Sequence, residues 1–172
     1  MKKGGFGGAN TKTGIIFEKN TDFLTKLKKI EYYDIKNSEI FYKGKKVGFA
    51  FKKYGLYRYL EAQGIDYRKF ISKKILPDDA IFVIANNTLF IIEIKFQHTP
   101  GSTDEKLQTC DFKIKQYKKL FSKLNVEVQY IYILNKWFQK KEYKDVLDYI
   151  ISINGCGYYF EYLPFQKLGL PV

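Results

Sequence analysis

The chain has 172 residues, of which 45% are hydrophobic and 18% are aromatic. This composition excludes global disorder and provides enough apolar surface for the core of one domain spanning residues 1–172. No apolar run approaches the roughly 20 residues that cross a bilayer. The charged start of the chain also lacks the apolar centre of a signal peptide. We therefore expect a cytoplasmic protein without a membrane partner.

Charge and rare residue types narrow the chemistry. Thirty Lys and Arg residues against 18 Asp and Glu residues give a net charge of +12, which favours a polyanionic partner such as DNA. An A+T-rich genome would produce the same lysine excess, so charge alone does not decide the partner. His98 is the only histidine, and Cys110 and Cys156 lack metal-ligand spacing and are expected to be free thiols. These counts exclude zinc sites built on paired histidines and most Ser-His-Asp mechanisms.

The chain begins with a basic segment and an amphipathic helix. Residues 1–12 are glycine-rich and basic, so we expect them to be flexible unless a partner orders them, and Lys12 is a candidate DNA contact. A helix is predicted over about 14–30, with Glu18 opposite its apolar stripe. The stripe consists of Ile16, Phe23, Leu27 and Ile30.

The next segment predicts a hairpin followed by a helical region. Residues 39–52 alternate as two strands that turn at Lys43-Gly44. From 54 to about 74 the pattern becomes helical, with a break at Gly64. Arg58 and Arg68 lie beside tyrosines here, a mixture that suits a nucleic-acid surface, and both are candidate DNA-binding residues.

Residues 77–97 are the stretch around which the chain is organised. Two apolar runs flank Asn86-Asn87, a pair that tolerates the left-handed backbone of a tight turn. This predicts a β-hairpin with strands near 79–85 and 88–96. At its open end the hairpin brings an aspartate close to Glu93 and Lys95.

The length of the turn decides which aspartate takes part. With a two-residue loop, Ala80 faces Glu93 and Asp78 faces Lys95, so that Asp78, Glu93 and Lys95 share one face of the sheet. A three-residue loop would put Asp79 in that place. Clustered carboxylates repel each other unless a cation lies between them, and hard oxygen ligands suit Mg²⁺. The sequence therefore predicts a magnesium site with a lysine beside it.

The rest of the chain completes a mixed α/β pattern. A capping box at Ser102 predicts a helix from about Thr103, followed by a strand over 126–134. A second helix is expected from Trp137, and a last strand over 158–163. Gln97 and His98 extend the motif strand toward the site, as a candidate catalytic and a candidate DNA-binding residue. This order predicts a mixed central sheet flanked by helices on both faces.

Pro77-Asp78 followed by Glu93-Ile94-Lys95 resembles the motif of the PD-(D/E)XK nuclease superfamily, which includes small type II restriction endonucleases. The resemblance implies a restriction-endonuclease-like fold and Mg²⁺-dependent hydrolysis of phosphodiester bonds. It implies Asp78 or Asp79 with Glu93 as metal ligands, and Lys95 beside the attacking water. Many members also carry a glutamate on their first helix, to which Glu18 corresponds.

These observations lead to a hypothesis with two alternatives. The leading one is a type II restriction endonuclease, a homodimer that cuts both strands of a short site in double-stranded DNA. A Holliday-junction resolvase or repair nuclease with the same core is the first alternative. A DNA-binding module without catalysis is the second, which the clustered carboxylates disfavour because a pure binder gains nothing from them near phosphate.

Overall fold

A single seven-stranded sheet organises the part of the chain that the computed structural model describes, which is residues 22–99, 101 and 103–171. The strands follow each other across the sheet in chain order. They are β1 (Tyr33–Lys36), β2 (Glu39–Tyr42), β3 (Lys45–Phe51), β4 (Asp79–Val83), β5 (Thr88–Lys95), β6 (Glu127–Leu134) and β7 (Cys156–Phe160).

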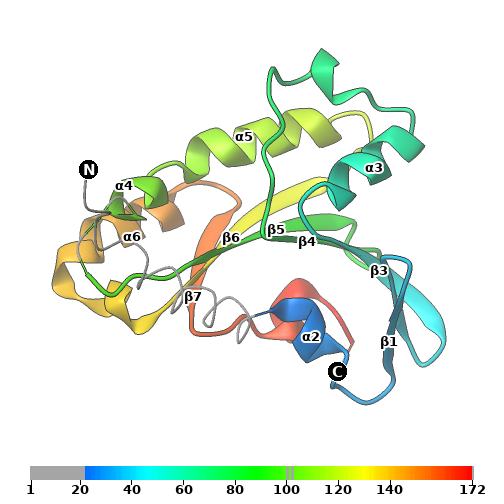
Figure 1. Ribbon diagram of the computed structural model, residues 1–172, viewed down its shortest axis with the longest axis horizontal. Helices are drawn as coiled ribbons and strands as arrows, with labels where there is room; N and C mark the ends of the chain where they lie inside the picture. Colours follow the sequence, from blue (N-terminus) through cyan, green and yellow to red (C-terminus); the bar gives the residue numbers. More distant parts are fainter. Residues whose placement is uncertain (1–21, 100, 102, 172) are drawn as a thin grey trace, which may run out of the picture.

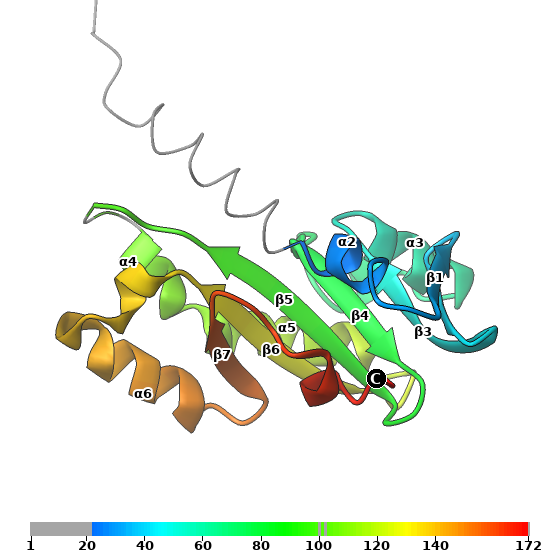
Figure 2. The same cartoon turned by 90° about the horizontal axis from the view of Figure 1, so that it is seen from below.

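Helices cover both faces of this sheet, as the sequence predicts (Figure 1). On one face lie α3 and α5, and on the other lie α2 and the C-terminal turn η4. Figure 2 shows α6 beside β7 at one end of the sheet and β1 at the other. The helices are α2 (Phe23–Leu27), α3 (Gly55–Ala62), α4 (Thr103–Leu107), α5 (Cys110–Phe121) and α6 (Lys144–Ser152), with short 3-10 turns η1 (Tyr67–Lys69), η2 (Lys136–Gln139), η3 (Lys141–Tyr143) and η4 (Phe165–Leu168).

The sheet changes from antiparallel to parallel at β5. The pairs from β1 to β5 are antiparallel, and β1, β2 and β3 are joined by two-residue turns. Asn37, Ser38, Lys43 and Gly44 in these turns all have positive φ, as such turns require. After β5, the helices α4 and α5 and then α6 make the crossovers that parallel strands need, so β5, β6 and β7 run parallel. A parallel strand flanked on both sides is buried on both faces, which explains the continuous apolar runs of β5 and β6.

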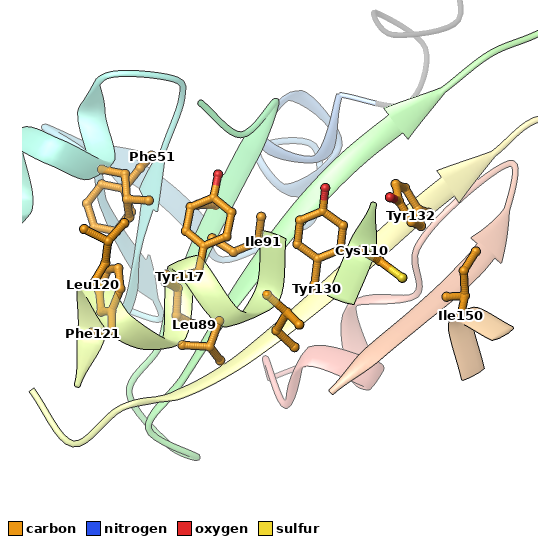
Figure 3. Packing of buried hydrophobic residues seen from close by; sticks show 14 of the residues in the cluster. Phe51, Leu89, Ile91, Cys110, Tyr117, Leu120, Phe121, Tyr130, Tyr132 and Ile150 are labelled. Carbon is orange, nitrogen blue, oxygen red and sulfur yellow. The ribbon is translucent and has the colours of Figure 1, made fainter. Parts of the chain in front are cut away.

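The core has two layers, one on each face of the sheet. On the α5 face, Leu89 and Ile91 of β5 pack against Tyr117 and Leu120 of α5 (Figure 3). On the α2 face, β4 and β5 pack against Phe23 and Leu27, with the C-terminal residues Leu163, Leu168 and Leu170. Alternation along each strand therefore decides the layer to which a residue belongs.

Most predicted elements are present, with differences at their ends. The strand β1 was missed, although Asn37-Ser38 is a turn signal. The helix expected from Thr103 is two helices, because the Thr109 hydroxyl donates to the Lys106 carbonyl at 2.8 Å and competes with the helical ladder. Extended backbone at Lys140 delays the helix expected from Trp137 until Lys144.

The last strand runs over Cys156–Phe160 instead of 158–163, because Glu161 has a left-handed backbone that ends it. The predicted N-terminal segment over residues 1–12 lies outside the described residues, as does the start of the helix expected over 14–30. Both cysteines are free, as expected. Within the described ranges, no helix is long and apolar enough to cross a membrane.

Candidate active site

The β4–β5 hairpin turns through four residues and not through two. Val83 pairs with Thr88, so that residues 84–87 form the loop and Ala80 lies opposite Ile91 where Glu93 was expected. Two-residue hairpin turns of types I′ and II′ both need positive φ at the first central residue, and Asn86 does not have it, whereas Asn87 does. The Ile84 amide donates to the Val47 carbonyl of β3, and the Asn87 amide donates to the Ile84 carbonyl and closes the turn. The predicted register is therefore wrong by two residues.

A shift of two residues leaves every side chain on its predicted face. Continuing the register beyond the Asp79–Ile92 pair places Asp78 opposite Glu93. Asp78 therefore shares the α5 face with Glu93 and Lys95. Of the two aspartates that the sequence left open, Asp78 and not Asp79 therefore lies beside these two residues, although the loop has four residues and not two.

Glu93 is the buried centre of the group, with only 5% of its surface exposed. Its Oε2 lies 2.5 Å from Lys95 Nζ, and its Oε1 lies 3.1 Å from Lys113 Nζ of α5. Burial raises the pKa of the Glu93 carboxyl, but the charges and hydrogen bonds of the two lysines outweigh it and hold the pKa below its usual range. The carboxylate is therefore kept ionised in the interior.

The Lys95 ammonium lies among three oxygen atoms. Besides Glu93 Oε2, its Nζ is 3.3 Å from the Ile94 carbonyl oxygen and 3.9 Å from Asp78 Oδ2. Asp78 Oδ2 also accepts a hydrogen bond of 2.8 Å from the Ile94 backbone N–H, which fixes the carboxyl group against β5. Burial raises the pKa of Asp78, against the opposing charge of Lys95.

This donor set fits a small hard cation. Carboxylate and carbonyl oxygens gathered around one positive centre are the ligands that Mg²⁺ takes, and Mg²⁺ usually uses only one or two carboxylates and keeps several waters. Among the described residues there is no group of three His, Cys, Asp or Glu side chains placed to hold a metal ion. Asp78 and Glu93 are the two carboxylates available here.

Two tyrosines of the core lie next to these charges. Tyr117 and Tyr130 direct their hydroxyl groups to the same side of the core (Figure 3). Burial and then the charge of Glu93 raise the pKa of both hydroxyls, so both stay protonated. Tyr117 donates to the Ile75 carbonyl at 3.1 Å, whereas the Tyr130 hydroxyl has no hydrogen-bond partner among the described residues. Tyr130 also presents its ring to Lys113 Nζ, 5.8 Å from the centroid.

Gln97 lies just beyond the end of β5 and is 5% exposed. Its backbone is held by Asn135, whose Oδ1 accepts from the Gln97 amide at 3.2 Å and whose Nδ2 donates to the Gln97 carbonyl at 2.9 Å. Neither polar atom of its side-chain amide has a hydrogen-bond partner within the described part of the chain. The side chain is thus buried with its hydrogen-bonding capacity unused.

Asp79 belongs to the opposite face and to a different cluster. It is 3% exposed, and its Oδ1 lies 3.9 Å from Lys52 Nζ, which also pairs with Asp22 at the start of α2. Burial raises the pKa of Asp79 to about 6, with Lys52 opposing this rise and the negative Asp22 and Asp78 adding to it. The structure therefore separates Asp79 from the group around Glu93.

The candidate DNA-binding residues do not gather at one place. Arg68 is exposed and pairs with Asp66 at 2.9 Å. Arg58 is exposed on α3 and lines a surface cavity beside β3. His98 is exposed, with its ring 5.0 Å from that of Phe96. Lys12 and Glu18 lie outside the described residues.

Lys113 is the contact of Glu93 that sequence reasoning missed. Ile114 and Tyr117 face the sheet, and Lys113 lies next to that stripe on the first turns of α5, from where its ammonium group reaches Glu93. Lys115 borders the same stripe, so the helical pattern alone does not single out Lys113. Comparisons of the chain with protein-family models, with curated proteins and with solved structures found no match.

Proposed function

We propose that the chain is a Mg²⁺-dependent endonuclease that hydrolyses phosphodiester bonds of double-stranded DNA at a specific sequence. In this proposal Asp78 and Glu93 hold the metal ion, and Lys95 acts on the attacking water. Two copies of the chain cut the two strands of a two-fold symmetric site.

The observation that carries the proposal is the placement of Lys95 Nζ among oxygens of Asp78, Glu93 and Ile94. Two carboxylates and two lysines meet at one strand end, and Glu93 among them is buried at 5% exposure. Burying a charged group costs stability, and such clusters of partly buried charges are frequent at functional sites, so the group is a candidate for chemistry.

A magnesium ion at such a site lowers the pKa of a bound water and neutralises charge that develops on the phosphate. Asp78 is fixed by the Ile94 N–H at Oδ2, which would hold its carboxylate in place for ligation. Lys95 would turn from the carboxylates toward the water or the phosphate. When Lys95 turns away, Lys113 on α5 would keep a positive charge beside Glu93.

We propose that cleavage is specific to a sequence because β1, β2 and β3 continue the sheet beyond the motif hairpin and α3 packs beside them. These elements lie outside the motif hairpin and provide room for the readout of base pairs. The basic excess of +12 supports a polyanionic substrate.

The test is cleavage of supercoiled plasmid and long linear DNA with Mg²⁺, with Mn²⁺ and with EDTA. We expect discrete fragments that require the metal. Glu93→Gln and Lys95→Met should each slow single-turnover cleavage by about a thousandfold or more. Both variants should still bind DNA, and Glu93→Gln should bind more tightly because a carboxylate near the phosphate is lost.

Matched control variants are Asp148→Asn and Lys144→Met, which remove an exposed carboxylate–lysine pair joined at 2.6 Å outside the site. They should cut at the wild-type rate. Cleavage by both site variants at that rate would refute the assignment of the site. Wild-type protein that cuts neither duplexes nor four-way junctions with either metal would refute the activity itself.

A further inference from the structure

A second hollow lies on the same face of the sheet as the candidate active site. It is a cavity of about 400 Å³ lined by residues of the β1–β2 turn, β2, β3 and α3. This volume falls within the range of about 300–1,000 Å³ that is typical of sites for small planar molecules. We call it the aromatic cup and define it by Phe49, Phe51, Tyr59, Arg58 and Glu39.

Three rings line the cup. Phe49 and Phe51 project from the same face of β3 and lie nearly parallel, with centroids 6.3 Å apart and planes at 7°. The ring of Tyr59 from α3 is tilted against both, at 5.5 Å from Phe49 and 5.0 Å from Phe51. Phe51 is buried, whereas Phe49 and Tyr59 are only partly covered, so part of each of these two side chains can contact a ligand.

The rim of the cup carries both a donor and an acceptor. The Arg58 guanidinium has no carboxylate partner among the described residues, and it lies over the start of α3, 3.7 Å from the point where a Cβ on Gly55 would be. Glu39 lies opposite Phe49 in the sheet and pairs with Lys46 at 2.8 Å. This contact is exposed, so a ligand can replace Lys46 as the partner of Glu39. Lys46 Nζ also lies 5.2 Å from the centroid of Phe49.

The cup and the active site lie on the same face of the sheet. Phe51 pairs with Ala80, and Ala80 pairs with Ile91, which precedes Glu93 by two residues. Phe51, Ala80 and Ile91 are buried in the core between the cup and the site. Because neighbouring strands lie about 4.8 Å apart, β3 is roughly 10 Å from β5, a separation that a few nucleotides can span.

We propose that the aromatic cup binds an unstacked nucleobase of the DNA strand that the Asp78–Glu93–Lys95 group cleaves; this rests on the proposed function. Every base offers a π face to Phe49 and Tyr59, and stacking on aromatic side chains is how proteins hold unpaired bases. The guanidinium of Arg58 donates to acceptors on the base edge, and Glu39 accepts from an exocyclic amino group.

Charge favours a base over a phosphate or another anion. The Glu39 carboxylate at the rim repels a second negative group, whereas a neutral heterocycle with both donors and acceptors satisfies Glu39 and Arg58 together. The three rings offer a phosphate no hydrogen-bond donor. The cup therefore selects a planar neutral group attached to a charged backbone.

The experiment compares two fluorescein-labelled single strands by anisotropy in EDTA, so that cleavage does not interfere. One is a 12-nucleotide strand of mixed sequence, about the length that a single-strand site covers. The other has the same phosphates but an abasic residue at every position. Wild-type protein should bind the base-bearing strand about tenfold more tightly, since stacking of one base has about this effect.

Two variants and one control locate this preference. Arg58→Gln and Phe49→Leu should reduce it to less than about threefold. Arg68→Gln, which changes the other arginine of the chain and lies outside the cup, should keep it in full. Arg58 is exposed, so its substitution is tolerated by the fold even where that of Phe49 is not.

An unchanged preference in Arg58→Gln would overturn the cup as a base site. Wild-type protein that cuts DNA but binds both strands equally would also overturn the cup and leave the proposed function intact. Wild-type protein that neither cuts DNA nor binds either strand would overturn both.

Discussion

At the scale of single residues, the carboxylate of Glu93 is shared between two ammonium groups from different elements. Lys95 comes from the same strand and reaches one oxygen, and Lys113 comes from α5 and reaches the other. Any metal ion that binds Glu93 must compete with these two charges. In the proposed function, the second lysine would weaken metal binding while it keeps Glu93 ionised and fixed.

We expect Lys113→Gln to lower the Mg²⁺ concentration that gives half-maximal cleavage, by about threefold or more. Removing one positive charge a few ångströms from the ion relieves a repulsion of this order or larger. Lys115→Gln is the control, because Lys115 lies on the same helix but pairs with Asp111 in an exposed contact. Titration of the single-turnover rate with Mg²⁺ measures both, and a higher requirement in Lys113→Gln would contradict the argument.

The two neighbouring aspartates should differ sharply in their effect on cleavage. Asp78→Asn removes a proposed ligand and should slow the reaction by about a thousandfold or more. Asp79→Asn changes a group on the other face and should cost no more than about tenfold. Single-turnover rates at saturating Mg²⁺ measure the effect of each substitution. An inactive Asp79→Asn together with an active Asp78→Asn would reverse the assignment of the ligand.

Asp79 should instead influence stability. Its pKa is about 6 in the folded protein against an ordinary value of 3.8, so between these values the folded state binds more protons than the unfolded state. Stability then falls as pH rises through this window, by roughly 3 kcal/mol at most for this group.

Asp79→Asn removes the ionisable group and with it the fall in stability between about pH 4 and pH 6. The variant should therefore be more stable than the wild type above pH 6 and should lose its advantage near pH 4. Urea unfolding in EDTA at a series of pH values measures the difference. An advantage that is the same at pH 4 and pH 8 would show that the carboxylate is not the cause.

At the scale of elements, the face of the motif hairpin was predictable although its register was not. The alternation of apolar residues fixes which side of a strand is buried, and an error of two residues preserves it. The register depends on the turn, and the backbone of residues 84–87 is set partly by tertiary contacts. The Asn86 side chain donates to the Leu168 carbonyl, 82 positions away, and Ile84 bonds to β3.

The parts that sequence did not predict have similar causes. Lys113 contacts Glu93 only because α5 packs across β5, and periodicity alone does not distinguish it from Lys115. The strand β1 lies at the edge of the sheet and is only four residues long, which is too short for a recognisable alternation of apolar and polar residues. Asp78, Glu93 and Lys95 were predictable because they lie on two strands joined by a short loop.

The β3–β4 pairing, which supports Asp78, should depend on one glycine. A Cβ at Gly48 would lie 2.4 Å from the Phe82 carbonyl oxygen, so Gly48→Ala must push the strands apart. We expect a loss of roughly 1–3 kcal/mol in the free energy of unfolding. Gly157→Ala in β7 is the matched control, because a Cβ there meets nothing within 4 Å. Urea unfolding compares the two, and equal stabilities would contradict the clash.

At the scale of the whole molecule, the positive charge is in excess and only partly used by ion pairs. Lys43, Lys74 and Lys140 have no carboxylate partner among the described residues and lie over aromatic rings. A net charge of +12 raises the self-repulsion of the folded chain, and a polyanion that binds it relieves this repulsion. Unpaired lysines spread over several elements suit a long, charged ligand better than a small one.

Binding of DNA should therefore weaken steeply with salt. Each phosphate that the protein neutralises releases counterions, and each adds about −0.9 to the slope of log K against log salt for a duplex. If five or more lysines contact phosphates, the slope should be about −4 or steeper. Lys95→Met should make this slope shallower by about one, because Lys95 is proposed to lie beside the scissile phosphate. Lys144→Met is the control, because it removes an exposed lysine paired with Asp148 and should leave the slope unchanged. Anisotropy titrations in EDTA between 50 and about 200 mM salt measure the slopes. An affinity that does not change over this range would mean that the lysines do not bind phosphates, and the excess charge would then have no role in recognition.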